Sequence, residues 1–183
     1  TIIKIEKATA ASVPGVLAVF THDDLDNDGV GLIQPSATLS GRNGKTCYVP
    51  PRRLLAKDKV VHIGEAVAMV VAETLEKALD AAEIVKVDYL ELPANTETEL
   101  ALKEKTPRIW SDAPSNLCLD WETGNAAAVD AAFANAAHVT EICGLVNNRI
   151  AATSIEGRAA LGQFDRSSQK YTLYVTCPFV HNL

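Results

Sequence analysis

Residues 59–92 read KVVHIGEAVAMVVAETLEKALDAAEIVKVDYLEL, and the changing periodicity of this stretch decides the fold. Residues 59–62 are predicted to form a strand, which a turn at residues 64–65 joins to the run 66–72. Because that run is apolar at every position, it is typical of a strand buried on both faces. The stretch therefore begins with two strands.

A helix and a third strand complete this unit. Thr74 can cap the helix, since its hydroxyl can accept a hydrogen bond from a free backbone N–H of the first turn. The apolar residues that follow repeat at helical spacing and share one face: Leu75, Ala78, Leu79, Ala82 and Val85. Residues 85–89 return to a period of two and predict another strand. The order strand, turn, strand, helix, strand predicts an α+β fold.

Before this unit, the sequence predicts two strands and a long loop. Alternating apolar side chains within residues 1–21 indicate a strand on each side of a turn at residues 13–15. Residues 22–51 are rich in Asp, Gly, Ser, Asn and Pro, which indicates a loop with at most short strand pieces near residues 30–33 and 47–49. A loop of this length favours a functional or docking role.

After the unit, a polar linker is predicted to run extended over the surface to about residue 116. Asn125 can then cap a helix over residues 126–136. The apolar stripe of that helix is expected to pack inward: Val129, Ala132, Phe133 and Ala136. Strands are expected over residues 138–146, 158–165 and 170–176. The polar residues 166–169 predict a hairpin turn between the last two strands.

Composition excludes several classes of protein. The 17 Lys and Arg against 23 Asp and Glu give a net charge of -6, which argues against nucleic acid as a partner. The longest apolar runs are far shorter than the roughly 20 residues of a membrane span. The first residues also lack the pattern of a secretory signal, so a cytoplasmic location is expected.

The cysteines predict neither a redox motif nor a zinc knuckle. They are widely spaced, without a C-x-x-C pair, and are interpreted as buried or reduced thiols: Cys47, Cys118, Cys143 and Cys177. The histidines include no pair at helical or knuckle spacing, and each is interpreted as a surface or strand residue: His22, His62, His138 and His181.

Two segments match part of an ion-binding motif, but the residues around them do not complete either motif. Residues 24–29 match the opening of an EF-hand calcium loop, but its twelfth position is Pro35 instead of a carboxylate and its eighth is Gly31. A solvated acidic turn is the preferred interpretation. Residues 44–46 match the end of a phosphate-binding loop, but no strand precedes them and two prolines, at positions 50 and 51, forbid the helix that should follow. A glycine-rich loop is preferred.

Three further side chains have a structural interpretation. Glu65 is interpreted as a turn carboxylate and not as a buried catalytic acid. Trp110 and Trp121 flank the acidic linker, where an exposed aromatic ring would mark a partner surface, but packing over the adjoining core is preferred for both.

Taken together and in order, several stretches resemble a known family. In the first half they are residues 13–16, 20–21, 61–74, 78–85, 87–89 and 92–94. In the second half they are residues 116, 120–121, 124, 128–133, 136–139, 147–149 and 155–162. Their order and spacing are similar to those of the large, molybdopterin-binding subunit of the xanthine dehydrogenase, aldehyde oxidase and aerobic carbon monoxide dehydrogenase family. The resemblance covers nearly the whole chain.

The resemblance implies a division of the chain and a chemistry. Residues 1–94 would be an a/b hammerhead domain with a mixed sheet, 95–115 a linker, and 116–183 the N-terminal part of a molybdopterin-binding domain. The implied reaction inserts a water-derived oxygen into a C–H bond of an aldehyde or N-heterocycle, or oxidises carbon monoxide. Molybdenum on molybdopterin, expected as the cytosine dinucleotide, carries this chemistry.

The resemblance also implies partners and the position of the catalytic residues. The partners would be the remainder of the large subunit and the iron-sulfur and FAD subunits or domains, in a homo-oligomer of such heteromers. The family's glycine-rich cofactor loop and catalytic glutamate are expected beyond Leu183. Residues 176–179, Thr-Cys-Pro-Phe, stand where the family has a glutamine near the metal. Glu156, Gly157 and Arg158 match the motif that opens the pterin domain, with Arg158 expected to pair or cap.

No catalytic or metal-binding residue is therefore expected in this chain, while the cofactor contacts, the substrate and the family branch are left open. The first hypothesis is a fragment of a molybdenum hydroxylase large subunit, a structural and assembly part that is inactive alone because it cannot build a closed site. The alternative is a stand-alone hammerhead-fold binding or assembly module without redox activity. A calcium-binding module through residues 24–28 is a distant third.

Overall fold

Two antiparallel strand pairs organise residues Thr1–Glu122 in the computed structural model, which describes residues 1–35, 38–146 and 154–177. Strand β1 (Ile2–Glu6) pairs with β4 (Lys86–Tyr89), and β2 (Val16–Phe20) pairs with β3 (Met69–Ala72). The predicted α+β class is confirmed. The helices of this unit are α1 (Ala8–Ala11), α2 (His22–Asn27), the short 3-10 helix η1 (Arg42–Gly44) and α3 (Leu75–Ile84).

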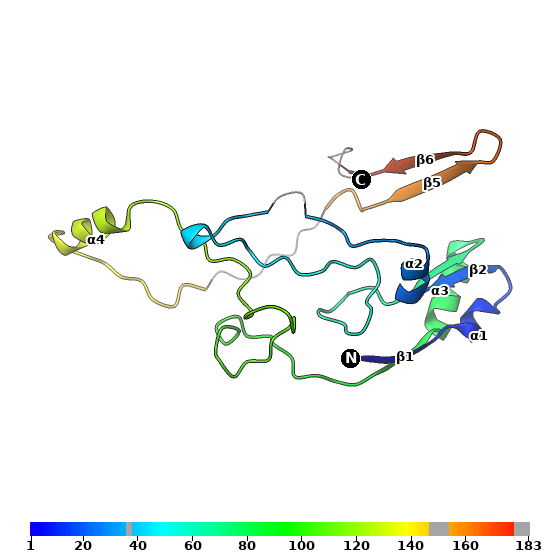
Figure 1. The fold of residues 1–183 in the computed structure, drawn as a ribbon, viewed down its shortest axis with the longest axis horizontal. Coiled ribbons are helices and arrows are strands. Elements are labelled where there is room, and N and C mark those ends of the chain that lie inside the picture. Colours follow the sequence, from blue (N-terminus) through cyan, green and yellow to red (C-terminus); the bar gives the residue numbers. More distant parts are fainter. Residues whose placement is uncertain (36–37, 147–153, 178–183) are drawn as a thin grey trace. The chain divides into compact units, whose positions relative to one another are not determined.

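The core of this unit lies where α1 and α3 meet the β2–β3 pair, as Figure 1 shows. Ala10 of α1, Val19 of β2 and Ala81 of α3 are buried there. Both alanines are fully buried, and their small side chains let the two helices pack close to the strands. Half-buried apolar side chains surround this contact: Val16, Val70, Ile84 and Val85.

Helix α3 has the predicted cap but a different inward face. The Thr74 hydroxyl accepts a hydrogen bond from Lys77 N at 3.3 Å, as the sequence predicts. Ala81 and Ile84 face the core, whereas Leu75 and Leu79 are 70% and 58% exposed. The apolar face that the spacing predicts is therefore not the buried face of the helix at these two leucines. The close contact with Ala81 decides which face of the helix turns inward, and spacing alone does not reveal it.

The strands predicted before α3 are shorter than expected. Residues 59–62 form no strand, and the run 66–72 is a strand only over β3. Glu65 provides the reason, because its carboxylate accepts a hydrogen bond from Val61 N at 2.6 Å and closes a turn. Only one face of β3 is covered by α3, so Met69 and Val71 are exposed and the expected burial on both faces was wrong.

The first fifty residues contain more helix than the sequence predicted. The strands at β1 and β2 are confirmed, but α1 lies between them in addition to the turn. The expected loop over residues 22–51 contains α2 and η1, while its strand pieces are reduced to isolated bridges, Ile33 with Arg52 and Ser40 with Thr46.

The expected extended linker after residue 94 is instead folded into successive turns. Asn116 holds them together. Its side-chain amide donates to the carbonyl oxygens of Ala101 and Pro107, each at 3.0 Å, and its carbonyl oxygen accepts from Ile109 N at 3.0 Å. A single buried or half-buried amide can stabilise such a segment, because it replaces the hydrogen bonds that a sheet would provide.

The second unit, Thr123–Leu183, contains a helix and a hairpin. Asn125 caps α4 (Ala126–Ala134) as predicted, with Oδ1 accepting from Ala128 N at 3.0 Å. Strands β5 (Ala160–Asp165) and β6 (Lys170–Val175) form the predicted hairpin. The strand expected over residues 138–146 is absent from the described structure, where these residues are irregular.

The described residues of the second unit form no buried core. Val129 and Phe133 of α4 are more than half exposed, so the expectation that they pack inward was wrong for the described structure. In the hairpin, Phe164 stacks on Tyr171 with 4.5 Å between ring centroids, and both rings remain accessible. A two-stranded hairpin alone is marginally stable in water.

The core contact gives a direct test. Ala10→Leu should destabilise the first unit by about 1–3 kcal/mol, because the added methylenes enter a fully packed contact. Ala11→Leu is the matched control, since the neighbouring Ala11 is exposed and its change should stay within about 0.5 kcal/mol. Hydrogen exchange of the β2 amides, followed by mass spectrometry, would measure the loss of stability in both variants. Equal protection in the two variants would contradict the packing described here.

Candidate functional site

The acidic segment after β2 is built around the start of α2. Asp24 Oδ2 accepts hydrogen bonds from the backbone N–H of Thr21 at 2.7 Å and from its hydroxyl at 2.8 Å. Lys7 forms an ion pair with the same carboxylate. The Lys7 ammonium, followed by the two Thr21 donors, lowers the pKa of Asp24 from 3.8 to about 2. Asp24 is therefore an anchor for α2.

Two residues further along α2, a second acid joins two segments that are distant in sequence. Asp26 Oδ2 lies 3.3 Å from Lys57 Nζ and 3.5 Å from His22 Nε2. Lys57, with smaller contributions from His22 and Arg53, holds the pKa of the Asp26 carboxyl below its ordinary value. His22 is only 6% exposed, which corrects its interpretation as a surface or strand histidine.

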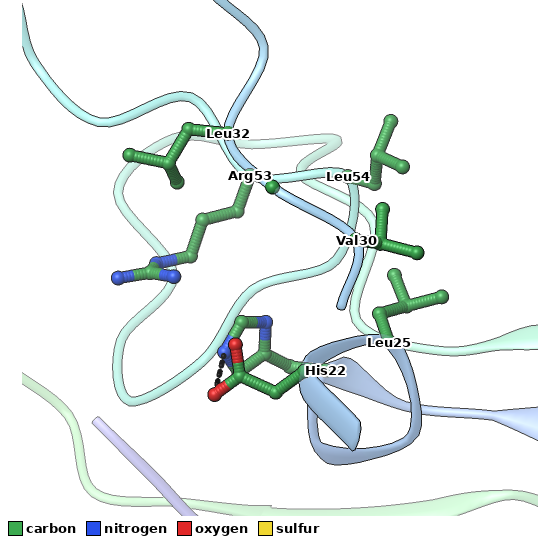
Figure 2. Close-up of a pocket in the computed structure, with 8 residues that line it drawn as sticks. His22, Leu25, Val30, Leu32, Arg53 and Leu54 are labelled. Atoms are coloured by element: carbon green, nitrogen blue, oxygen red, sulfur yellow. Dashed lines mark ion pairs between the residues drawn. The ribbon is translucent and has the colours of Figure 1, made fainter. Parts of the chain in front are cut away.

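Three hollows surround the segment 53–58. The first, of about 80 Å³, is shown in Figure 2, where His22 and Arg53 line it together with Leu25, Val30, Leu32 and Leu54. The second, of about 330 Å³, contains Trp110 and Lys59, and the third, of about 390 Å³, lies along β1. The larger two have the size of ordinary ligand pockets. Their linings mix lysine and aspartate side chains, which suits the docking of polar groups.

An arginine clamp fixes the last residues of the first unit. The Arg42 guanidinium lies 3.3 Å from Asp120 Oδ2 and 2.8 Å from Glu122 Oε2. Its backbone N–H donates to Asp120 O at 2.6 Å, and Tyr48 N donates to Cys118 O at 3.0 Å. A side chain at Gly41 would collide with that carbonyl of Asp120, so the close approach requires glycine. Residues 118–122 are thereby held against residues 41–48.

The two apparent ion-binding motifs adopt other structures. Residues 24–27 belong to α2, and both of the acids described above already have basic partners, so the calcium interpretation and the solvated turn were both wrong. Residues 42–44 form η1, and Lys45 that follows is extended, so no helix is available for a phosphate. Within the described ranges, no three His, Cys, Asp or Glu side chains are grouped to hold a metal ion.

The remaining candidate residues are dispersed. Glu65 is a turn carboxylate, as predicted. Trp110 is half-buried, but Trp121 is 63% exposed, so the expected packing was wrong for the second tryptophan. Cys47, Cys118 and Cys143 are free thiols.

Further along the chain, His62 and His138 are exposed, and so are residues 156–158, including Arg158. His181 and residues 178–179 lie outside the described residues. The role expected for Arg158 stays a prediction. No helix in the described part of the chain has the length and apolar character that a bilayer span needs.

Sequence reasoning missed the His22, Asp26 and Lys57 group and the Arg42 clamp. A local signal existed for α2, because Thr21 and Asp24 have the spacing of a capping box. No local signal pairs Asp26 with Lys57 or Arg42 with Glu122, since these partners are far apart in sequence.

The chain is similar to one family profile and to the large subunits of two enzymes. The family profile described as "Aldehyde oxidase and xanthine dehydrogenase, a/b hammerhead domain" matches residues 1–93. The nicotine 6-hydroxylase large subunit of Paenarthrobacter nicotinovorans is 30% identical over 182 residues, 97% of this chain and 21% of the relative. The carbon monoxide dehydrogenase large chain of Hydrogenophaga pseudoflava is 32% identical over 190 residues, 97% of this chain and 22% of the relative.

Solved structures give the same result. Quinoline 2-oxidoreductase from Pseudomonas putida 86 superposes with a TM-score of 0.73 and 30% identity, covering 95% of this chain and 21% of that one. The Cu,Mo-CO dehydrogenase in its carbon monoxide reduced state gives a TM-score of 0.78 and 27% identity, covering 96% and 22%. The chain thus spans about a fifth of the length of these relatives.

The Asp24 anchor predicts a pH dependence. Its folded-state pKa of about 2 is below the ordinary 3.8, so its contribution to stability is present above about pH 4 and is lost as the pH falls toward 2. In Asp24→Ala, the first unit should lose about 1 kcal/mol at neutral pH. The urea midpoint of that variant should also fall less between pH 5 and pH 2.5 than the wild-type midpoint. Asp23→Ala, at an exposed neighbouring position, is the control. An identical acid response in wild type and Asp24→Ala would show that Asp24 is not the anchor.

The clamp predicts a position-specific effect of adding one methyl group. Gly41→Ala should loosen residues 118–122 and cost about 1–3 kcal/mol, because the new Cβ meets backbone that cannot rotate away. Gly31→Ala is the control, since open space surrounds that glycine. Hydrogen exchange of the Tyr48 and Arg42 amides is the measurement. Unchanged exchange in Gly41→Ala would refute the close approach.

Proposed function

The chain belongs to the aldehyde oxidase and xanthine dehydrogenase family through its a/b hammerhead domain, and from this premise we propose that it is part of a molybdenum hydroxylase large subunit. The observation that carries the proposal is the similarity of 97% of the chain to two large subunits of such enzymes. The full-length protein would be an oxidoreductase acting on an aldehyde, an N-heterocycle or carbon monoxide. Electrons would leave through iron-sulfur and FAD partners, as in the arrangement that the sequence resemblance implies.

The proposed role of these residues is structural. Large apolar side chains are exposed on α4 and on the β5–β6 hairpin, among them Phe133, Leu161 and Leu173. Burial of such surface is the main favourable term in folding, so the proposal assigns its cover to the remainder of the large subunit. The proposed division is a hammerhead domain over residues 1–94, a linker over residues 95–115 and the start of the pterin domain over residues 116–183.

The proposal assigns no metal ligand and no catalytic group to the described residues. Among them, no three His, Cys, Asp or Glu side chains are grouped together, and residues 156–158 are exposed. No catalytic step is therefore assigned to this chain. Molybdopterin, in the cytosine dinucleotide form that the resemblance suggests, would bind to other parts of the full-length protein. The cytoplasmic location and the assembly into a homo-oligomer of heteromers stay predictions.

Metal analysis of the native protein tests this proposal. An antibody against this segment would capture the protein from its own cells, and mass spectrometry would measure the metals in the captured material. Molybdenum together with iron is expected, with a cytosine nucleotide released on denaturation. The 183-residue chain alone is the control, and it should bind no pterin and give no turnover with an artificial electron acceptor. Absence of both metals, in a band no larger than this chain, would favour a hammerhead module without redox activity.

A further inference from the structure

Helix α3 has an apolar row on the side that faces away from the core. Leu79 follows Leu75 by four residues and Ala82 follows Leu79 by three, so the three side chains line up along the helix. Leu75 is 70% exposed, Leu79 is 58% exposed and Ala82 is exposed as well. The core contact uses the opposite side, through Ala81. Since the outer side of a surface helix is usually polar, this row indicates that another element covers it.

A row of acidic side chains runs beside the apolar row. Glu76, Asp80 and Glu83 each follow one residue after a member of the apolar row, and all three are exposed. Within the described residues, no basic side chain forms an ion pair with any of them. The lysine of the helix, Lys77, is paired with Glu73 instead, with 2.7 Å between Lys77 Nζ and Glu73 Oε2. The outer side of α3 therefore carries three carboxylates without a basic partner.

A covering element must be apolar over the leucines and positively charged beside them. A basic amphipathic helix meets both conditions, because its apolar stripe and its Lys or Arg side chains also repeat every three or four residues. A second copy of α3 does not, since two acidic rows would repel each other. Helices α1, α2 and α4 contain no lysine or arginine, so none of them supplies the cations.

We propose that the outer side of α3 is the docking surface for a basic amphipathic helix of another polypeptide. The apolar stripe of that helix lies on Leu75, Leu79 and Ala82, and its lysines or arginines face Asp80 and Glu83. A charged row speeds diffusional encounter, which benefits a separate polypeptide, whereas a segment of the same chain is already present at high local concentration. The docking helix is therefore assigned to a different polypeptide.

A synthetic helical peptide of leucine, lysine and alanine, with a fluorescent label, is the probe for the acidic row. Anisotropy would measure its Kd for the intact protein that contains this chain. Asp80→Lys together with Glu83→Lys should weaken binding about tenfold, because attraction becomes repulsion at two positions. Lysine suits the C-terminal half of a helix, so α3 should stay folded in this variant. Glu97→Lys with Glu99→Lys, at exposed positions outside α3, changes the net charge equally and should leave the Kd unchanged.

The same probe tests the apolar row. Leu79→Ser should weaken binding by about tenfold, because the peptide loses an apolar contact. Leu102→Ser is the matched control, since Leu102 is 60% exposed and lies outside α3. A peptide with glutamate in place of every lysine should not bind. No binding of the lysine peptide, equal binding of the two peptides, or the same Kd for each variant and its control would overturn the proposal.

Photo-cross-linking in the native cells identifies the polypeptide that covers the surface. The photoreactive p-benzoylphenylalanine would replace Leu79 in the full-length protein, with a second variant carrying it at Leu102. Mass spectrometry of the cross-linked peptides should join position 79, but not position 102, to another polypeptide at a segment with apolar and basic residues at helical spacing. A cross-link from position 79 to the same polypeptide only, to a segment without such basic residues, or to nothing would refute the docking of a basic helix from a partner.

Discussion

The close contact of Ala10 and Ala81 over Val19 determines the arrangement of the first unit. Strand β1 leads into α1, and α3 leads into β4, so packing both helices at one point brings β1 and β4 close enough to pair. The β2–β3 pair forms the floor of the same contact. Larger side chains at the two alanines would separate the helices and remove the condition for that pairing.

Local signals predicted the elements that depend on local chemistry. The caps at Thr74 and Asn125 and the turn of the β5–β6 hairpin follow from hydrogen bonds within a few residues, and the sequence identified all three. Long-range choices were not predictable. The exposure of Leu79 depends on which face of α3 meets strands that are distant in sequence. The turn at Glu65 forms because the Glu65 carboxylate, and not a neighbouring strand, accepts the hydrogen bond from Val61 N.

In the candidate site too, the local features left a signal in the sequence and the long-range contacts did not. The composition of residues 24–29 predicted an acidic turn, but the capping contacts of Thr21 and Asp24 begin a helix there. The neutralisation of Asp26 by Lys57 joins residues far apart in the chain, so no spacing rule could reveal it. The family was predicted from the order of motifs along the whole chain, and each motif alone carried little information.

The Arg42 clamp has a consequence for recombination between related proteins. Both halves of the clamp, residues 41–48 and 118–122, lie within the first unit, and the acidic half ends where that unit ends. A chimaera that exchanges all of residues 1–122 would keep every charge of the clamp with its own partner. A crossover between residues 48 and 118 would instead combine an arginine from one parent with the acids of another. Crossovers directly after residue 122 should therefore preserve folding far more often than crossovers between residues 48 and 118.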